Sequence, residues 1–384
     1  ISMVSGTVAV SYLSMKDMNA TGGAVFTASN TTDLGNNTGW SIGLPASQSL
    51  YWRGGTGNWN DPNHWSTSSG GPAGTCVPTP YDNVYFDASS FTANGQSVTI
   101  NVTAYCNSMS WAGTTNTHAL IGTSELHIYG SLTLAASVAL TGNYTGQVYF
   151  ESANSGNTIF SAGKTFSGDI YFNGPGDWTL QDAFNTAVVI RLFNGTLMTN
   201  NKNLTCGSFE SSGSNIRQLV LGSSTVTVSS YYSAWNIGGS NFALDAGTST
   251  IKFTNTYSST SMIAGTSDAY YDVIFQDANT GGYIGGGTSF YHNVTFNGAG
   301  SISTASGTTF GKVEFKGDGT INYSNYFDSL IFSAGKTYTL DYNAVQTVNS
   351  DIRAQGTCGQ FITLQSNSPG NKAFISKATG AVTL

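Results

Sequence analysis

The sequence predicts an all-β protein, a right-handed parallel β-helix or β-solenoid with a small Trp-rich β cap subdomain. The first observation is that short Val/Ile/Leu-x-Phe segments recur in two runs, and within each run the phenylalanines are 17 to 22 residues apart. The other is the lack of helical periodicity, because Gly, Asn, Asp and Ser interrupt the β-branched and aromatic runs. A period near 20 residues is typical of solenoid coils, whose equivalent positions stack at the strand spacing of about 4.8 Å.

The repeated segments start after about residue 119 and define the predicted solenoid, residues 119–384. They are Val148–Phe150, Ile170–Phe172, Arg191–Phe193, Ile251–Phe253, Val273–Phe275, Val294–Phe296, Val313–Phe315 and Leu330–Phe332. A β-sandwich is the alternative, but its equivalent residues need not be evenly spaced. We therefore expect coils over Thr133–Leu364, with no helix longer than about two turns. The phenylalanines expected to point inward are Phe172, Phe275, Phe296, Phe315 and Phe332.

The last ten residues resemble the first ten. Ile375–Leu384 (ISKATGAVTL) matches Ile1–Val10 (ISMVSGTVAV), with Ile, Ser, Gly and Val in register at an offset of 374 residues. The simplest interpretation is one period of a longer tandem array, cut inside the repeat. Neighbouring repeats of the same polypeptide are then the expected partners, and the two matching segments should adopt the same strand conformation.

Residues 1–44 are accordingly predicted to be the end of a preceding repeat unit. Val8–Leu13 and Ala24–Ala28 have the composition of strands, and Thr32–Trp40 that of a turn-rich closing loop. Ser41–Leu50 contains Pro45 and is interpreted as a linker.

Residues 45–118 differ in composition from the rest of the chain and are predicted to form the cap subdomain. A solenoid needs a cap because an uncapped end exposes its hydrophobic core and the unpaired amides of its edge strands. This segment holds four of the seven tryptophans and most of the prolines. Trp52, Trp59 and Trp65 are candidates for a sugar-stacking platform. The competing interpretation is a small aromatic core, which a Gly-rich subdomain needs.

Composition excludes several classes of protein. Only 9% of the 384 residues are charged, the net charge is −7, and aromatic residues make up 12%. Disordered chains have few aromatics and high charge, and nucleic-acid binding needs clustered cations, so we expect neither. The sequence contains no stretch of about 18 apolar residues, so we expect no membrane span. Polarity from hydroxyls and amides suits an extracellular or cell-surface stalk.

Two further site predictions come from local patterns. Asp33, Asn36 and Asn37 place oxygen atoms close together in the sequence DLGNNTG, a candidate Ca²⁺ site, although an Asx-rich turn explains the same residues. Cys76 and Cys106 flank a compact segment, and we predict a disulfide between them because such bonds persist outside cells. No other cofactor is expected.

Catalytic motifs are missing, and we expect no enzyme activity. Parallel β-helices that cleave polysaccharides use paired carboxylates, for which the candidates are Asp268 with Asp272, Glu314 and Asp318. None sits in an Asp-Asp or Asp-x-x-Asp motif among basic residues. The chain has no GxSxG motif and only four histidines. The Gly-rich run Gly281–Gly287 lacks the Lys and helix start of a phosphate loop.

A resemblance supports a structural role. Trp52–Ser66 (WRGGTGNWNDPNHWS), followed by Pro80–Phe86 (PYDNVYF), is similar to a module of giant tandem-repeat extracellular adhesin and fibre proteins of gliding and predatory bacteria. Gly356–Ser366 and Asp33–Trp40 resemble the end of the same unit. The likeness covers the ends well and the middle loosely. Related modules occur in phage fibres, and the adhesins are often exported by a type 9 secretion system.

The expected function is therefore a structural repeat unit of a long extracellular filament or cell-surface adhesin that mediates attachment. Besides neighbouring repeats, the expected partners are further copies of the chain and surface glycans or a host or prey cell surface. The alternative is a carbohydrate-binding or carbohydrate-cleaving β-helix, such as a phage tail spike.

Overall fold

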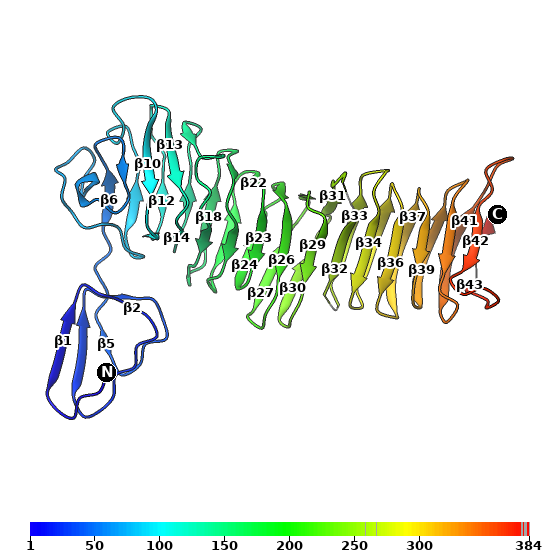
Figure 1. Ribbon diagram of the computed structural model, residues 1–384, viewed down its shortest axis with the longest axis horizontal. Coiled ribbons are helices and arrows are strands. Elements are labelled where there is room, and N and C mark those ends of the chain that lie inside the picture. The colour runs from blue at the N-terminus through cyan, green and yellow to red at the C-terminus, as the bar shows by residue number, and fades with distance from the viewer. Residues whose placement is uncertain (258, 266, 378, 380–381, 384) are drawn as a thin grey trace. The chain divides into compact units, whose positions relative to one another are not determined.

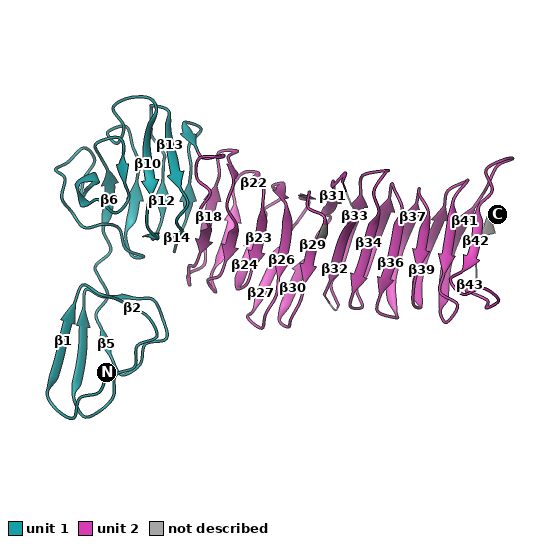
Figure 2. Ribbon diagram, viewed as in Figure 1, with its two compact units in different colours: residues 1–139 teal, residues 140–384 magenta. Residues whose placement is uncertain are grey.

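The computed structural model describes residues 1–384 except 258, 266, 378, 380–381 and 384. The chain is all-β, and the only helix among these residues is the short 3-10 turn η1 (Pro62–His64). It divides into two compact units, Ile1–Ala139 and Leu140–Leu384, which are described separately below (Figure 2).

Unit 2, residues 140–384, is a stack of coils whose strands form three sheets with parallel neighbours (Figure 1). Sheet I runs in the order β17 (Val148–Phe150), β20 (Ile170–Phe172), β23 (Val189–Leu192), β26 (Ser208–Ser211), β29 (Tyr232–Ile237), β32 (Thr260–Ala264), β34 (Gly282–Gly286), β36 (Gly300–Thr304), β38 (Gly319–Ile321), β40 (Thr337–Leu340) and β42 (Thr363–Ser366). Sheet II comprises β18 (Asn157–Phe160), β21 (Asp177–Leu180), β24 (Gly195–Met198), β27 (Arg217–Val220) and β30 (Phe242–Asp245).

Sheet III is β19 (Thr165–Phe166), β22 (Phe184–Thr186), β25 (Leu204–Cys206), β28 (Thr225–Val228), β31 (Thr250–Phe253), β33 (Ala269–Phe275), β35 (Phe290–Phe296), β37 (Thr308–Phe315), β39 (Asn325–Phe332), β41 (Val345–Ala354) and β43 (Phe374–Lys377), with β44 (Val382–Thr383) also paired to β41. Sheet II ends at β30, and later coils alternate between the longer strands of sheet III and sheet I. The parallel coils confirm the solenoid and contradict the β-sandwich.

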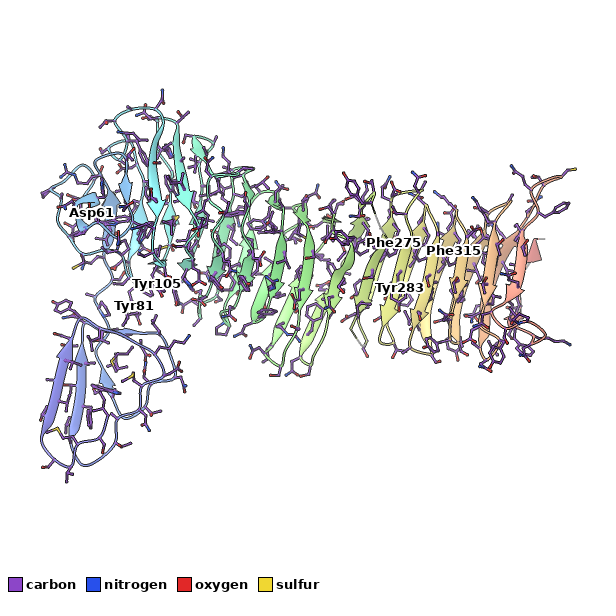
Figure 3. The ribbon with its side chains drawn as sticks, viewed as in Figure 1. Asp61, Tyr81, Tyr105, Phe275, Tyr283 and Phe315 are labelled. Atoms are coloured by element: carbon purple, nitrogen blue, oxygen red, sulfur yellow. The ribbon has the colours of Figure 1, made fainter. Side chains whose placement is uncertain are left out.

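The interior of unit 2 is held together by stacked aromatic rings. In sheet III the rings of Phe253, Phe275, Phe296 and Phe315 follow one another at centroid distances of 4.7 Å, 4.9 Å and 4.9 Å. Phe332 extends the stack at 6.2 Å. All five phenylalanines predicted to face inward are buried, so that prediction is confirmed. Figure 3 labels two members of the stack, Phe275 and Phe315.

The phenylalanines that repeat in the sequence belong to two different stacks, one in sheet I and one in sheet III. Phe150 and Phe172 pair in sheet I, whereas the later phenylalanines lie in sheet III. The assignment of Phe193 to the series is wrong by one residue: Phe172 is paired with Leu192, and Arg191 and Phe193 lie either side of that inward position. Side chains alternate faces along a strand, so a shift of one residue exchanges inside for outside.

A row of glycines makes room for these rings. Gly282, Gly300 and Gly319 are register partners in sheet I and face the interior. A Cβ built on Gly282 would lie 2.3 Å from Phe275 Cγ. The Gly-rich run 281–287, which matched no phosphate loop, therefore contains strand β34, whose inward-facing Gly282 makes room for Phe275.

Unit 1 contains two groups of sheets. Residues 1–42 form the parallel sheet β1 (Thr7–Ser11), β3 (Val25–Ser29) and β5 (Ser41–Ile42), beside the pair β2 (Ser14–Met15) and β4 (Thr32–Asp33). The predicted linker is shorter than expected, because β5 pairs with β3 and β6 begins at Ser49.

The rest of unit 1 is again built from parallel coils. Its sheets contain β6 (Ser49–Trp52), β9 (Asn83–Tyr85), β12 (Met109–Ser110) and β15 (Leu132–Thr133); β7 (Gly57–Asn58), β10 (Gln96–Ile100), β13 (His118–Gly122) and β16 (Val138–Ala139); and β11 (Ala104–Cys106) with β14 (Leu126–Ile128). The short strand β8 (Trp65–Ser66) folds back antiparallel to β6. Strand β13 crosses the predicted boundary between residues 118 and 119 and pairs with β10.

Candidate functional site

The tryptophans predicted as a sugar-stacking platform lie inside the protein. Trp52, Trp59 and Trp65 are at most 1% exposed. Trp65 meets the other two rings edge to face, at centroid distances of 5.2 Å and 4.9 Å. The indole N–H groups of Trp52 and Trp65 donate to the backbone carbonyls of Gly55 and Trp59, both at 2.8 Å. The platform prediction is wrong, because a ring must expose a face to stack on a sugar. The competing interpretation, an aromatic core, is the observed one.

The local sequence explains how this core closes. The Asp61 side chain accepts a hydrogen bond from the Asn63 backbone N–H at 2.9 Å, and Pro62 begins η1. That turn reverses the chain so that β8 returns along β6, and it lays the ring of His64 parallel to Trp52 at 4.7 Å. The loop around residue 61 is thus a capped turn.

The candidate calcium residues form a hydrogen-bonded turn. Asp33 Oδ1 accepts from the Gly35 backbone N–H at 2.9 Å and from Asn37 Nδ2 at 2.6 Å. Asn36 Nδ2 donates to Asp17 Oδ1 at 2.7 Å, and Asn37 Oδ1 accepts from the Met18 backbone N–H at 2.9 Å. These bonds are those of an Asx-type turn. Among the described residues no three His, Cys, Asp or Glu side chains gather as a metal site. Calcium binding here stays a prediction.

The predicted Cys76–Cys106 disulfide is absent, and the prediction is wrong. Both cysteines are free thiols; Cys76 is exposed, whereas Cys106 is fully buried on the inward face of β11. Burial raises the pKa of the Cys106 thiol well above its usual value. A bond between an exposed and a fully buried sulfur would require the backbone of one of them to move. Proximity along the chain predicted the pair, but the alternation of β11 turns Cys106 inward, whereas Cys76 lies in an exposed loop outside any strand.

The carboxylates weighed for catalysis lie in unlike environments. Asp272 is on the outer surface, where its Oδ1 accepts from Asn293 Nδ2 at 2.7 Å. Asp268 is buried, and its Oδ2 accepts from the Tyr270 hydroxyl at 3.2 Å and from the Gly265 backbone N–H at 3.1 Å. Because burial disfavours the charged form, it raises the pKa of Asp268. Asp318 is exposed, and its Oδ1 accepts from the Thr337 backbone N–H at 2.8 Å.

Asp318 borders a surface groove that no sequence motif marks. The groove has a volume of about 500 Å³ and runs across sheet I over β34, β36, β38 and the start of β40. We call it the Tyr283 groove and define it by the lining residues Gly281, Tyr283, Ala299, Ser301, Asp318 and Thr320. Tyr283, Ser301 and Thr320 are register partners on the outward face, so they form one row along the coil axis.

Tyr283 is seated in this groove by a glycine. Gly285 is two residues further along β34 and faces outward like Tyr283, yet it is buried. A Cβ on Gly285 would lie 2.6 Å from Tyr283 Cε1 and 2.7 Å from its hydroxyl oxygen. The tyrosine ring therefore lies over Gly285 along the strand. Figure 3 labels Tyr283 on this part of unit 2. A G-Y-x-G pattern on a strand is the only sequence signal that could have indicated it.

The two matching ten-residue segments agree in part. Val8–Ala9 lie in β1, and the equivalent Val382–Thr383 form β44. Ser376 lies in β43, whereas its equivalent Ser2 makes only an isolated parallel bridge, to Thr21. Residues 378, 380–381 and 384 of the second segment lie outside the described residues.

Comparison with known proteins identifies no relative. No protein family, no curated protein and no solved structure matches this chain. The single helical turn in the described part of the chain, Pro62–His64, is too short and too polar to span a membrane.

Proposed function

We propose that this chain is a structural repeat unit of a long extracellular filament or cell-surface adhesin that mediates attachment. The observation that carries the proposal is the uninterrupted pairing along unit 2, where sheets I and III continue from β17 and β19 to β42 and β43. Each coil is tied to the next by backbone hydrogen bonds, and stacked rings join several of the coils. Such a stack resists bending and leaves few exposed edges for proteases.

The composition of the surface supports the same role. Outward positions on the coils carry mostly hydroxyl and amide groups, and only 9% of all residues are charged. A weakly charged, hydrated surface can project from a cell without strong attraction to ions or nucleic acid. The self-similarity of Ile1–Val10 and Ile375–Leu384 adds a second reason, because tandem repetition is how solenoid filaments gain length.

Immunogold electron microscopy on intact cells of the source organism tests the proposal. Antibodies raised against the purified full chain should label filaments or patches on the outer surface of unpermeabilised cells. Pre-immune serum and an antibody to a cytoplasmic protein serve as controls for background and for cell integrity. Labelling that appears only after permeabilisation would contradict an extracellular role.

A further inference from the structure

The Tyr283 groove has features of a ligand site that the filament role does not require. Its floor is open because two outward positions on adjacent coils carry almost no side chain, Gly281 and Ala299. Tyr283 stands at one border and Asp318 at another. A volume of about 500 Å³ lies in the range of small-molecule sites. The groove is therefore large enough for a ligand of a few sugar rings.

The tyrosine is preorganised to present a flat surface. Its ring lies over Gly285, where any side chain would displace it, so the glycine allows the ring to lie along the strand. Tyr283 is partly exposed, unlike the fully buried aromatic stack beneath sheet I. A fixed tyrosine ring offers an apolar face together with a polar hydroxyl, which is the combination that pyranose rings need on their C–H and O–H sides.

The polar groups beside the ring are spaced regularly. Ser301, Thr320 and Thr339 follow Tyr283 in strict register across β36, β38 and β40. Neighbouring strands place such a row at intervals of about 4.8 Å along the coil axis. Hydroxyls at a regular interval match a ligand that is itself a repeating chain of hydroxylated units.

The charge of the residues that line the groove favours neutral polysaccharides over anionic ones. The residues that line the groove include one carboxylate, Asp318, and neither lysine nor arginine. The Thr337 backbone N–H holds this carboxylate at 2.8 Å, so it is positioned to accept hydrogen bonds from sugar hydroxyls. An anionic polysaccharide would meet this negative charge without a compensating cation.

From these observations we propose that the Tyr283 groove binds a neutral polysaccharide, with its chain running along the coil axis and one sugar ring stacked on Tyr283. This binding site does not depend on the filament proposal, because it lies on the outer face of unit 2 whatever the chain is attached to. Asp318, Ser301 and Thr320 would bind hydroxyl groups of successive sugars.

Native affinity electrophoresis of the full chain tests the inference. The gels contain hydroxyethyl cellulose, galactomannan or dextran as neutral polymers, and alginate as the anionic one. We expect retardation by at least one neutral polymer, no retardation by alginate, and a dissociation constant raised about tenfold or more by Tyr283→Ala, a loss of at least about 1.4 kcal/mol of binding. Tyr283→Phe keeps the ring and should keep most of the retardation.

Two further variants separate binding from folding. Gly281→Val fills the floor beside Ser259, whose Oγ a Cβ would approach to 2.9 Å, and should abolish retardation while Tyr283 is intact. Tyr326→Ala removes an exposed tyrosine from β39 in sheet III and should change nothing. Unchanged circular dichroism confirms that each variant folds. No retardation by any neutral polymer, or retardation that Tyr283→Ala and Gly281→Val leave intact, would overturn the inference.

Discussion

The ring of Phe296 occupies the space that a side chain on Gly300 would need. A Cβ built on Gly300 would lie 2.5 Å from Phe296 Cγ, and 2.7 Å from Cε1 of Phe315 on the next coil. The glycine is thus part of the aromatic core although it contributes no side chain to it. Sheet I can approach the phenylalanine stack of sheet III because the facing positions carry only hydrogen atoms.

Gly300→Ala should therefore destabilise the protein although alanine is favoured over glycine in most strands. Overpacking of a tight core costs about 1–3 kcal/mol, because the rings must leave their preferred positions. The midpoint of urea denaturation, followed by circular dichroism, measures the change. Ser301→Ala, at the next and outward-facing position, is the control and should stay within about 0.5 kcal/mol of the parent. Equal stability of the two variants would contradict the packing argument.

Arg217 is a buried cation whose hydrogen bonds go to backbone carbonyls and one hydroxyl. It is fully buried, and its guanidinium donates to the backbone oxygens of Asn215 at 3.2 Å and Gly213 at 3.1 Å, and to the Ser211 hydroxyl at 2.8 Å. Two further carbonyls, of Gly238 and Ser240 on the next coil, accept from the same Nη2. The Arg217 side chain thus links the turn that follows β26 to the turn that follows β29 on the next coil.

Arg217→Met should cost about 1–3 kcal/mol, since the buried Ser211 hydroxyl and the carbonyls of two turns lose the donors that Arg217 supplies. Arg217→Lys keeps the charge but cannot reach all five acceptors, so we expect an intermediate loss. Differential scanning calorimetry measures both. Arg353→Met is the matched control, because the Arg353 side chain is 62% exposed and pairs with a neighbouring carboxylate, Asp351. A loss at Arg217 no larger than at Arg353 would show that the carbonyl cluster is satisfied in another way.

Asp268 should make stability depend on pH. Its folded-state pKa lies above the ordinary value of 3.8 because the carboxylate is buried, and this effect outweighs the hydrogen bonds from Tyr270 and Gly265, which lower the pKa. The folded chain therefore holds this proton more tightly than the unfolded chain. The stabilising contribution is complete below about pH 3.8 and is lost as pH rises through the raised pKa.

Asp268→Asn removes this ionisation and keeps the shape of the side chain. We expect the variant to gain stability relative to the parent as pH rises from 4 to 8, with little difference at the acid end. Thermal unfolding at several pH values measures the gap between the two proteins. A gap that does not change with pH would mean that Asp268 keeps its ordinary pKa in the folded chain.

The periodicity of the sequence was enough to predict the parallel coils, but it could not predict which sheet or which face of a strand each side chain occupies. The spacing of Phe275, Phe296 and Phe315 was enough to predict parallel coils and an inward stack, because each coil repeats the same local pattern. The spacing could not show that Phe172 belongs to a different sheet, nor that Leu192 rather than Phe193 is its partner. Turn lengths between strands decide these registers, and turns of similar composition differ in length.

The candidate sites failed for a related reason. Trp52 and Cys106 were chosen by residue type, and residue type does not say which face of a strand the side chain occupies. The Tyr283 groove was overlooked because its floor consists of glycine and alanine, which carry no chemical motif. Only the register between coils brings Tyr283, Ser301 and Thr320 into one row.

The match between the chain's first and last ten residues predicts how two copies would join. Strand β1 pairs with β3 through Val8 and Phe26, and the equivalent strand β44 pairs with β41 through Val382 and Ile352. A strand that took the place of both β1 and β44 would pair in parallel with β3 on one side and with β41 on the other. In a tandem chain that continues from Leu384 directly to Ser11 of a second copy, residues 382–383 should therefore pair with both β41 and the second copy's β3.

Hydrogen exchange on this tandem chain measures the outcome, because amides that join the sheet exchange slowly. We expect strong protection of residues 25–29 in the second copy, which lacks its own residues 1–10 and can form this sheet only through the junction. The control deletes one residue there, so that Leu384 is followed by Tyr12; a one-residue shift turns the alternating side chains to the wrong faces and should remove the protection. Equal protection in the two chains would mean that β3 folds without the matching segment, and the tandem-array interpretation would lose its structural basis.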